Sequence, residues 1–198
     1  MKLFLIRHGQ TETSGETYAG RIDVPLNDAG RQQALNLSRE LSKTPISLIL
    51  TSPLARAIET AQPLGEMLGL DPLPEPALME LDFGLYEGRR KAELGLTLRK
   101  THAYTPTPSG ESLHDVWVRS GEVLQRLFDE SHSLDVNCAL VGHYWINRLL
   151  MGRVSGLSFD EACRSPGYRP VTGSCVELYL SSQEIERPAF NLGHIRQP

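Results

Sequence analysis

Short apolar runs alternate with amphipathic helical stretches along most of this chain, and that alternation constrains the fold most. Three runs have the character of buried strands: 2–6 (KLFLI), 46–50 (ISLIL) and 136–141 (VNCALV). A polar segment follows each run, and a stretch with helical periodicity follows the polar segment. Strands that alternate with helices form a mainly parallel sheet covered on both faces. The sequence therefore predicts an α/β fold, a three-layer α/β/α sandwich.

Local signals indicate where the helices begin. Asn27 can cap the first helix, and the Ser-x-x-Asp sequence at Ser112 resembles a capping box ahead of a long amphipathic helix. Ser52 followed by Pro53 predicts that a helix starts directly after the second strand. Pro63 lies within that helical pattern, so we expect a kink or a break there.

The remaining segments are less regular. Residues 84–110 mix glycine, proline and charge, which predicts a small lid insertion with one short helix around 90–99. Near the end of the chain, 175–180 has the pattern of a fourth strand, and 185–190 that of a weaker fifth. Without internal repeats or a long linker, we expect a single domain spanning residues 1–198.

Composition excludes several classes of partner. The formal net charge of −4 gives the molecule no general attraction for nucleic acid or anionic membranes, so we expect neither as a partner. An anionic ligand must instead be held by a local cluster of arginine and histidine. Cys138, Cys163 and Cys175 are odd in number and lack metal-like spacing, which favours reduced thiols and a cytoplasmic location.

Polar residues follow each of the three predicted strands. Arg7-His8-Gly9 comes after the first strand, Arg56 lies shortly after the second, and Gly142-His143 comes after the third. Because the carboxyl ends of parallel strands meet at one edge of a sheet, two histidines and two arginines should converge there. Each residue alone has an ordinary structural explanation, but their joint placement predicts an anion-binding site.

A metal site is the competing interpretation, with Glu80 as a third ligand beside the two histidines. The spacing of these residues matches no local metal motif. Arg7 beside His8 would repel a cation, whereas guanidinium groups bind phosphate oxygens with paired donors. We therefore expect no metal.

Several sequence blocks resemble one known family. The segment FLIRHGQTET (4–13) is similar to the L-x-R-H-G-x-T signature of the histidine phosphatase superfamily, which also contains the cofactor-dependent phosphoglycerate mutases. The resemblance continues, in family order, through 20–34 (GRIDVPLNDAGRQQA), 51–61 (TSPLARAIETA), 79–88 (MELDFGLYEG), 109–112 (SGES) and 140–143 (LVGH).

This resemblance implies a role for each candidate residue. His8 would be the nucleophile that is transiently phosphorylated. Arg7, Arg56 and His143 would hold the phosphoryl oxygens and stabilise the transition state. Glu80 occupies the position of the family's proton donor. No metal or other cofactor is implied, because arginine and histidine supply the positive charge.

Four further positions are candidates for substrate binding. Ser14 stands where most family members have an asparagine that helps to hold the phosphate. Gly20 and Arg21 belong to a block that often lies near the substrate, although Arg21 is equally consistent with a surface charge. Tyr144, like its neighbour Trp145, is either a core aromatic or part of the wall of the substrate pocket.

The expected activity is hydrolysis of a small phosphorylated metabolite. Within the superfamily the chain is most similar to short bacterial members such as alpha-ribazole phosphatase, which implies removal of the 5′-phosphate of alpha-ribazole phosphate in cobalamin assembly. A phosphoglycerate mutase or a broad-specificity sugar-phosphate phosphatase remains an alternative. A non-catalytic phospholigand sensor is the alternative from another class, and the oligomeric state is left open.

Overall fold

A single six-stranded sheet forms the centre of the molecule, with strand order β3-β2-β4-β1-β5-β6. The computed structural model describes residues 1–131, 136–164, 168–180 and 193–196. The first four strands pair in parallel, whereas β5 runs antiparallel to both β1 and β6. The strands are β1 (Lys2–Arg7), β2 (Ile46–Thr51), β3 (Leu73–Pro74), β4 (Asn137–Gly142), β5 (Cys175–Tyr179) and β6 (Gly193–Arg196). The prediction of a mainly parallel sheet is confirmed.

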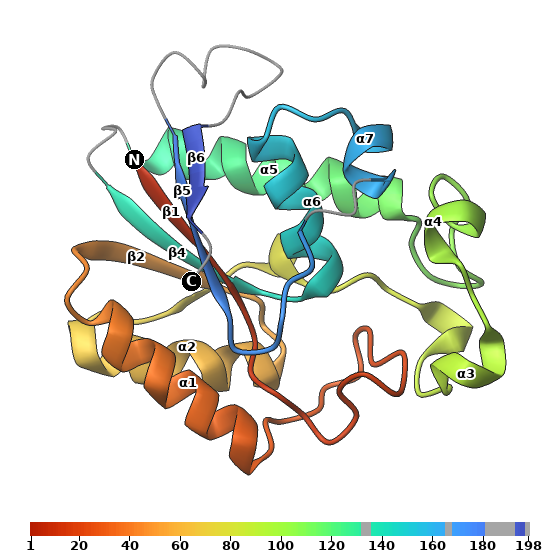
Figure 1. Cartoon of the computed structure of the whole chain (residues 1–198), viewed down its shortest axis with the longest axis horizontal. Coiled ribbons are helices and arrows are strands. Elements are labelled where there is room, and N and C mark those ends of the chain that lie inside the picture. Colours follow the sequence, from red (N-terminus) through yellow and green to blue (C-terminus); the bar gives the residue numbers. More distant parts are fainter. Residues whose placement is uncertain (132–135, 165–167, 181–192, 197–198) are drawn as a thin grey trace.

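Helices cover both faces of this sheet (Figure 1). The helix pair α1 and α2 packs on one face, while α5 and α6 pack together on the other and α7 packs on α6. The helices are α1 (Asp28–Leu41), α2 (Ala55–Leu68), α3 (Lys91–Leu94), α4 (Leu98–Thr101), α5 (Leu113–Ser131), α6 (Tyr144–Val154) and α7 (Phe159–Arg164), with 3-10 turns η1 (Pro76–Leu78) and η2 (Gly84–Tyr86). The three-layer sandwich is therefore as expected.

The side chains of β1 divide the core into two parts. Phe4 and Ile6 point to the layer of α1 and α2, and Leu3 and Leu5 point to the layer of α5 and α6. All four are at most 2% exposed, because successive side chains of a strand face opposite sides and both sides are covered here. The strand that carries Arg7 to the sheet edge is thus fixed on both faces.

Two of the predicted helix starts are confirmed. The side chain of Asn27 accepts a hydrogen bond from the backbone N–H of Gly30 at 2.8 Å and caps α1. Ser112 and Asp115 exchange bonds as a capping box, with the Ser112 N–H donating to Asp115 at 2.8 Å and the Asp115 N–H donating to Ser112 Oγ at 3.1 Å. The cap explains the Ser-x-x-Asp sequence.

The predicted start of α2 is wrong, and of the kink or break predicted at Pro63 the break is not found. Helix α2 begins at Ala55, with Leu54 as its N-cap, although the Ser52 hydroxyl accepts from the N–H of Leu54 at 3.4 Å as well as bonding to His143. The helix also continues through Pro63 to Leu68. Burial of its apolar stripe outweighs the single backbone hydrogen bond that proline removes.

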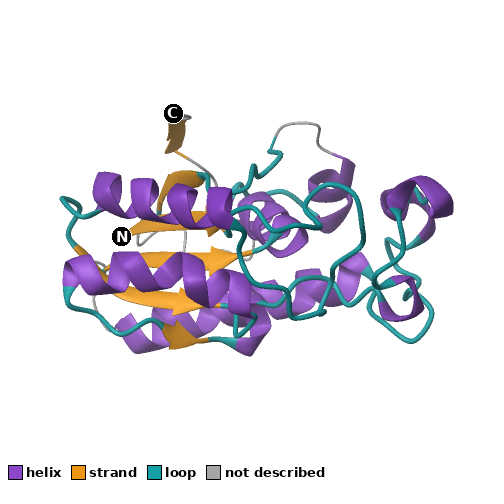
Figure 2. Cartoon of the chain, turned by 90° about the horizontal axis from the view of Figure 1, so that it is seen from below, coloured by secondary structure: helices purple, strands orange, loops and turns teal. Residues whose placement is uncertain are grey.

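The lid contains two short helices rather than the single one predicted. Gly95 adopts a left-handed backbone conformation with φ of 53° and ends α3, after which α4 starts at Leu98. In Figure 2 both helices project beyond the carboxyl ends of the strands. The predicted fourth strand is confirmed as β5, whereas the segment 185–190 lies outside the described residues. The single-domain organisation stays a prediction. No helix among the described residues is long and apolar enough to cross a membrane.

Candidate active site

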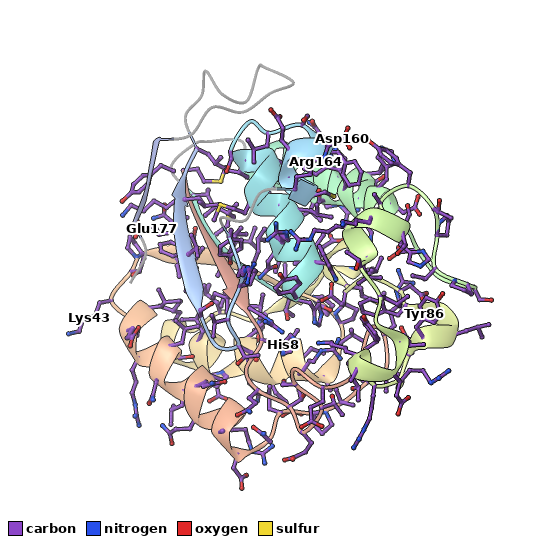
Figure 3. All side chains as sticks on the ribbon, turned by 45° about the vertical axis from the view of Figure 1, so that its right-hand side comes forward. His8, Lys43, Tyr86, Asp160, Arg164 and Glu177 are labelled. Carbon is purple, nitrogen blue, oxygen red and sulfur yellow. The ribbon has the colours of Figure 1, made fainter. Side chains whose placement is uncertain are left out.

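Neighbouring strands bring the predicted site residues to one edge of the sheet. Arg7 at the end of β1 lies in register with Gly142 at the end of β4, and the N–H of His8 donates to the carbonyl of Gly142 at 3.0 Å. Where β2 ends, the N–H of Ser52 donates to Val141 at 2.9 Å. The parallel register therefore places residues from three separate segments side by side. Figure 3 shows His8 inside the molecule, where β1 meets the loops.

His8 has one ring nitrogen held and one free for reaction. Its Nδ1 lies 2.7 Å from the carbonyl oxygen of Gly9, which can only accept, so Nδ1 carries the hydrogen and Nε2 keeps its lone pair. The ring is 6% exposed. Burial, followed by the charges of Arg56 and Arg7, lowers the pKa of His8 to about 3. His8 is therefore neutral at physiological pH, as a nucleophile must be.

His143 lies beside His8 but behind Arg56. The two imidazole ring centres are 5.0 Å apart. Nδ1 of His143 accepts from Arg56 Nε at 3.2 Å, so Nε2 carries the hydrogen and donates to Ser52 Oγ at 2.8 Å. Burial first, then Arg56 and His8, hold the pKa of His143 well below its usual value. His143 is fully buried and orients Arg56, and its expected contact with a phosphoryl oxygen stays a prediction.

Two arginines flank His8, of which Arg56 is buried and Arg7 half-buried. Arg56 is 2% exposed and donates to the carbonyls of Gly20 at 2.6 Å and Ile22 at 2.9 Å, in addition to His143. Arg7 donates to the carbonyl of Pro170 at 2.6 Å. Its buried Nε has no hydrogen-bond partner among the described residues. An unpaired buried donor beside the nucleophile is suited to an anionic oxygen of a ligand.

Glu80 lines the same cavity as His8. The residue is 7% exposed. Its Oε1 accepts from the N–H of Leu81 at 2.9 Å and from the N–H of Trp145 in the first turn of α6 at 3.0 Å. Two backbone donors therefore fix the direction of the carboxylate. The prediction that Glu80 lies near His8, Arg7 and Arg56 agrees with the shared cavity that all four line.

This cavity has a volume of about 360 Å³ and two kinds of wall. The polar residues come from the sheet edge, the loop after β1, the start of α2, the segment before the lid and, as Lys91, the lid itself. The apolar residues come from residues 18–19, Phe83, Leu98 in the lid and the start of α6. The polar lining residues are Arg7, His8, Thr11, Ser14, Thr17, Arg56, Glu80 and Lys91. The apolar ones are Tyr18, Ala19, Phe83, Leu98, Tyr144 and Trp145, and Gly15 and Gly20 complete the lining.

Three of the four predicted substrate-binding residues line the cavity. Ser14 lines it, although its hydroxyl already accepts from the N–H of Thr11 at 2.9 Å. Gly20 lines it with φ of 51°, and an added Cβ would lie 2.2 Å from the carboxylate of Glu87. Tyr144 forms part of the wall, with its ring centre 5.3 Å from the Arg7 guanidinium carbon. Trp145 also lines the cavity, so both aromatics face the pocket.

Arg21 is the exception among these residues. Its guanidinium lies 2.8 Å from a carboxylate oxygen of Glu111 and 3.4 Å from one of Asp82, and the side chain does not line the cavity. The two carboxylates engage this arginine in an ion-pair network, and a substrate contact of Arg21 stays a prediction.

Lys91 is a cavity residue that the sequence did not single out. Its side chain is exposed at the rim, with Nζ 5.9 Å from the ring centre of Tyr18. Partial desolvation, followed by the charge of Arg7, lowers the pKa of Lys91, and Glu80 opposes this change. The position lies in the predicted lid, but nothing in the local sequence indicates that the side chain turns inward.

The arrangement suits transfer of a phosphoryl group to an imidazole. It combines a neutral nucleophile, buried guanidinium donors and a carboxyl group in one cavity. Among the described residues, no group of three or more His, Cys, Asp or Glu side chains is placed to hold a metal ion.

Comparisons with known proteins agree with this chemistry. A family model described as the histidine phosphatase superfamily (branch 1) matches residues 3–189. The Cronobacter sakazakii protein named "Probable phosphoglycerate mutase GpmB" is 31% identical over 213 residues, covering 96% of this chain and 98% of that protein. A glucosyl-3-phosphoglycerate phosphatase of Mycolicibacterium vanbaalenii is 31% identical over 173 residues, covering 81% of this chain and 76% of that protein.

The fold matches solved structures as well. The crystal structure of the alpha-ribazole phosphatase from Shigella flexneri superposes with a TM-score of 0.82 at 25% identity, covering 98% of this chain and 100% of that chain. The family model spans nearly the whole chain, and the relatives include named phosphatases. This protein is therefore a phosphatase that belongs to the histidine phosphatase superfamily.

Proposed function

We propose that the protein hydrolyses small phosphomonoesters through a phosphohistidine formed on Nε2 of His8. One observation carries this proposal: a neutral imidazole with a free Nε2 stands in a cavity beside the buried guanidinium of Arg56 and the half-buried Arg7. Arg7 and Arg56 would bind the phosphoryl oxygens, and His143 would hold Arg56 in place through its Nδ1.

The first step would phosphorylate the enzyme. Nε2 of His8 attacks phosphorus, the bond from phosphorus to the ester oxygen breaks, and Glu80 in its protonated form gives its proton to the leaving alcohol. The guanidinium groups of Arg7 and Arg56 offset the charge on the transferred group. Glu80 is suited to this role because it shares the cavity and is shielded from bulk water.

The second step would regenerate the free enzyme. Water gives a proton to the Glu80 carboxylate and attacks phosphorus, the phosphorus–nitrogen bond breaks, and inorganic phosphate leaves. Glu80 is then protonated and ready for the next ester, while Nε2 of His8 recovers its lone pair.

The substrate we propose is alpha-ribazole 5′-phosphate, as used in cobalamin assembly in the cytoplasm. The apolar wall supports this choice, because Tyr18, Phe83, Tyr144 and Trp145 supply aromatic surface next to the phosphate site. The benzimidazole base of that ester is flat and largely apolar. Burying one of its faces would contribute on the order of 1–3 kcal/mol, which corresponds to a preference of about ten- to hundredfold over a bare sugar phosphate.

A second candidate substrate class rests on Lys91. A cation at the rim of the cavity suits a second anionic group, such as the carboxylate of a phosphoglycerate. Alpha-ribazole phosphate has no such group. The sugar-phosphate or phosphoglycerate alternative therefore predicts that Lys91→Gln lowers kcat/KM for 3-phosphoglycerate, whereas the alpha-ribazole proposal predicts little effect on the ribazole ester.

Phosphohistidine chemistry is tested by labelling. Wild-type enzyme mixed rapidly with an ester labelled in its phosphate should acquire acid-labile, base-stable label, and His8→Ala should acquire none. Turnover of His8→Ala should fall by several orders of magnitude, since the covalent route is lost. Label that persists in His8→Ala would refute the assignment, and absence of turnover in wild type would favour a phospholigand sensor.

Substrate choice is tested by comparing three esters. We expect kcat/KM for alpha-ribazole 5′-phosphate to exceed those for ribose 5-phosphate and 3-phosphoglycerate by at least about tenfold. Trp145→Ala should remove much of that margin and leave the two smaller esters nearly unaffected. Similar values for all three esters in the wild type would indicate a phosphatase of broad specificity.

A further inference from the structure

The backbone that carries Glu80 has little secondary structure to hold it. Strand β3 ends at Pro74, the 3-10 turn η1 ends at Leu78, and η2 starts only at Gly84. The carbonyl groups between these elements cannot pair with a neighbouring strand. Since buried backbone acceptors need partners, another part of the molecule must supply the donors.

Arg119, on α5, supplies them. Its Nη1 donates to the carbonyls of Ala77 at 2.8 Å and Met79 at 2.6 Å, and its Nη2 donates to the carbonyl of Glu80 at 3.0 Å. Its side chain is 13% exposed. One guanidinium group therefore fixes three backbone positions that lead up to and include Glu80.

Glu111 fixes the guanidinium in turn. Arg119 Nε donates to Oε1 of Glu111 at 3.2 Å, and Nη2 donates to Oε2 at 3.1 Å. All five N–H donors of an arginine side chain are thus used. The same carboxylate accepts from the N–H of Asp82 at 3.1 Å, and the N–H of Glu111 donates to the Asp82 carbonyl at 2.9 Å.

These contacts hold the main chain on both sides of Glu80. Arg119 holds the residues before it, and Glu111 holds Asp82 two residues after it. The carboxylate itself is oriented by the N–H of Trp145 on α6. The distance from the carboxyl group to His8 is therefore set by α5 through the main chain and by α6 through the side chain.

We propose that Arg119, locked by Glu111, is a positioning residue for the proton donor Glu80. The inference rests on the proposed function, in which Glu80 protonates the leaving oxygen. Arg119 touches neither substrate nor the cavity, and it acts on the reaction only through the place of Glu80. A misplacement of about 1 Å at a catalytic group can lower the rate by up to ~100-fold.

Arginine suits this position because of its geometry. Its planar fork reaches three carbonyls and a carboxylate at once, whereas a lysine has three donors on a single nitrogen and cannot span them. Arg119→Lys keeps the charge and much of the buried stem, but loses the fork. The variant therefore separates the positioning role from the presence of a positive charge.

The test measures single-turnover phosphorylation of the enzyme with two esters. An alkyl phosphate needs a proton on its leaving oxygen, whereas a dinitrophenyl phosphate hardly does. The variants are Glu80→Gln, Arg119→Lys, Glu111→Gln and the double variant Glu80→Gln/Arg119→Lys.

Arg153→Lys serves as the matched control. Arg153 also donates from a guanidinium to a backbone carbonyl, that of Trp117 at 2.7 Å, but it lies away from Glu80. Its replacement should lower thermal stability without distinguishing the two esters.

We expect Arg119→Lys to slow phosphorylation by the alkyl ester about tenfold or more and by the aryl ester about twofold at most. Glu111→Gln should show the same selectivity to a smaller degree, which gives a second reading if Arg119→Lys folds poorly. In the Glu80→Gln background Arg119→Lys should add no more than about twofold, because its effect passes through Glu80.

Failure of the inference and failure of the proposed function give different results. If Glu80→Gln slows both esters equally, Glu80 is not the proton donor and both proposals fall. If Glu80→Gln slows the alkyl ester selectively, the proposed function stands and the inference can still fail in two ways. Either Arg119→Lys and Glu111→Gln slow both esters equally, or Arg119→Lys adds its full effect in the double variant. In both cases Arg119 has only a structural role, and the inference alone is overturned.

Discussion

Replacing His8 with glutamine should make the protein less sensitive to acid. In the folded protein the pKa of His8 is lowered to about 3 by burial first, then by Arg56 and Arg7. In the unfolded chain the pKa returns to about 6.5. Between pH 3 and pH 6.5 the His8 side chain is therefore mostly protonated in the unfolded state and mostly neutral in the folded state.

The size of the effect follows from this difference. The stability that His8 contributes is complete above pH 6.5 and is lost as the pH falls toward 3. For a group that titrates only in the unfolded state, the loss between pH 7 and pH 5 is about 2 kcal/mol. His143 acts in the same direction, because its pKa is also held well below the usual value.

Urea unfolding at pH 7, 6 and 5 measures this contribution. The free energy of unfolding of the wild type should fall by about 2 kcal/mol more, from pH 7 to pH 5, than that of His8→Gln. The comparison uses how the free energy of unfolding changes with pH, so any change in stability that the substitution causes equally at every pH cancels. Equal pH dependence in the two proteins would mean that the pKa of His8 is not lowered in the folded state, which would refute the reasoning.

Two further predictions concern packing and thiol chemistry. Gly30→Ala should destabilise the protein by roughly 1–3 kcal/mol, because the new Cβ would lie 2.1 Å from the backbone oxygen of Gln10. Thermal unfolding measures this loss, and an unchanged Tm would contradict the close approach. Cys138 and Cys163 are buried, and burial raises the pKa of each thiol to about 11. Iodoacetamide at pH 8 should therefore modify them only after unfolding. Fast labelling of these two thiols in the native protein would count against their burial.

The strand ends were predictable because local patterns decide them. The run KLFLI fixes where β1 ends, and parallel pairing then brings Arg7, His8 and His143 to one edge. Periodicity cannot show which of those side chains meets the cavity. The ring of His143 is hydrogen-bonded to Ser52, which directly follows β2 and which sequence patterns assigned to a helix cap.

The lid was the least predictable part of the site. Lys91 and Leu98 line the cavity because hydrogen bonds between distant segments hold the lid, such as the N–H of Lys91 donating to Glu16 at 2.9 Å. Arg21, a candidate for substrate binding, is bonded to Glu111, ninety residues away in the sequence. Contacts between residues far apart in the sequence depend on the tertiary structure, and local sequence patterns do not indicate them.

The division of the cavity between two kinds of wall bears on how its specificity can change during evolution. The proposed nucleophile His8 and its neighbour Arg7 stand at the sheet edge, whereas Phe83, Lys91 and Leu98 reach the cavity from one contiguous stretch, residues 83–98. Substitutions or length changes in that stretch can alter which alcohol is accepted without disturbing the nucleophile. New specificities can therefore arise here at low risk to the reaction itself.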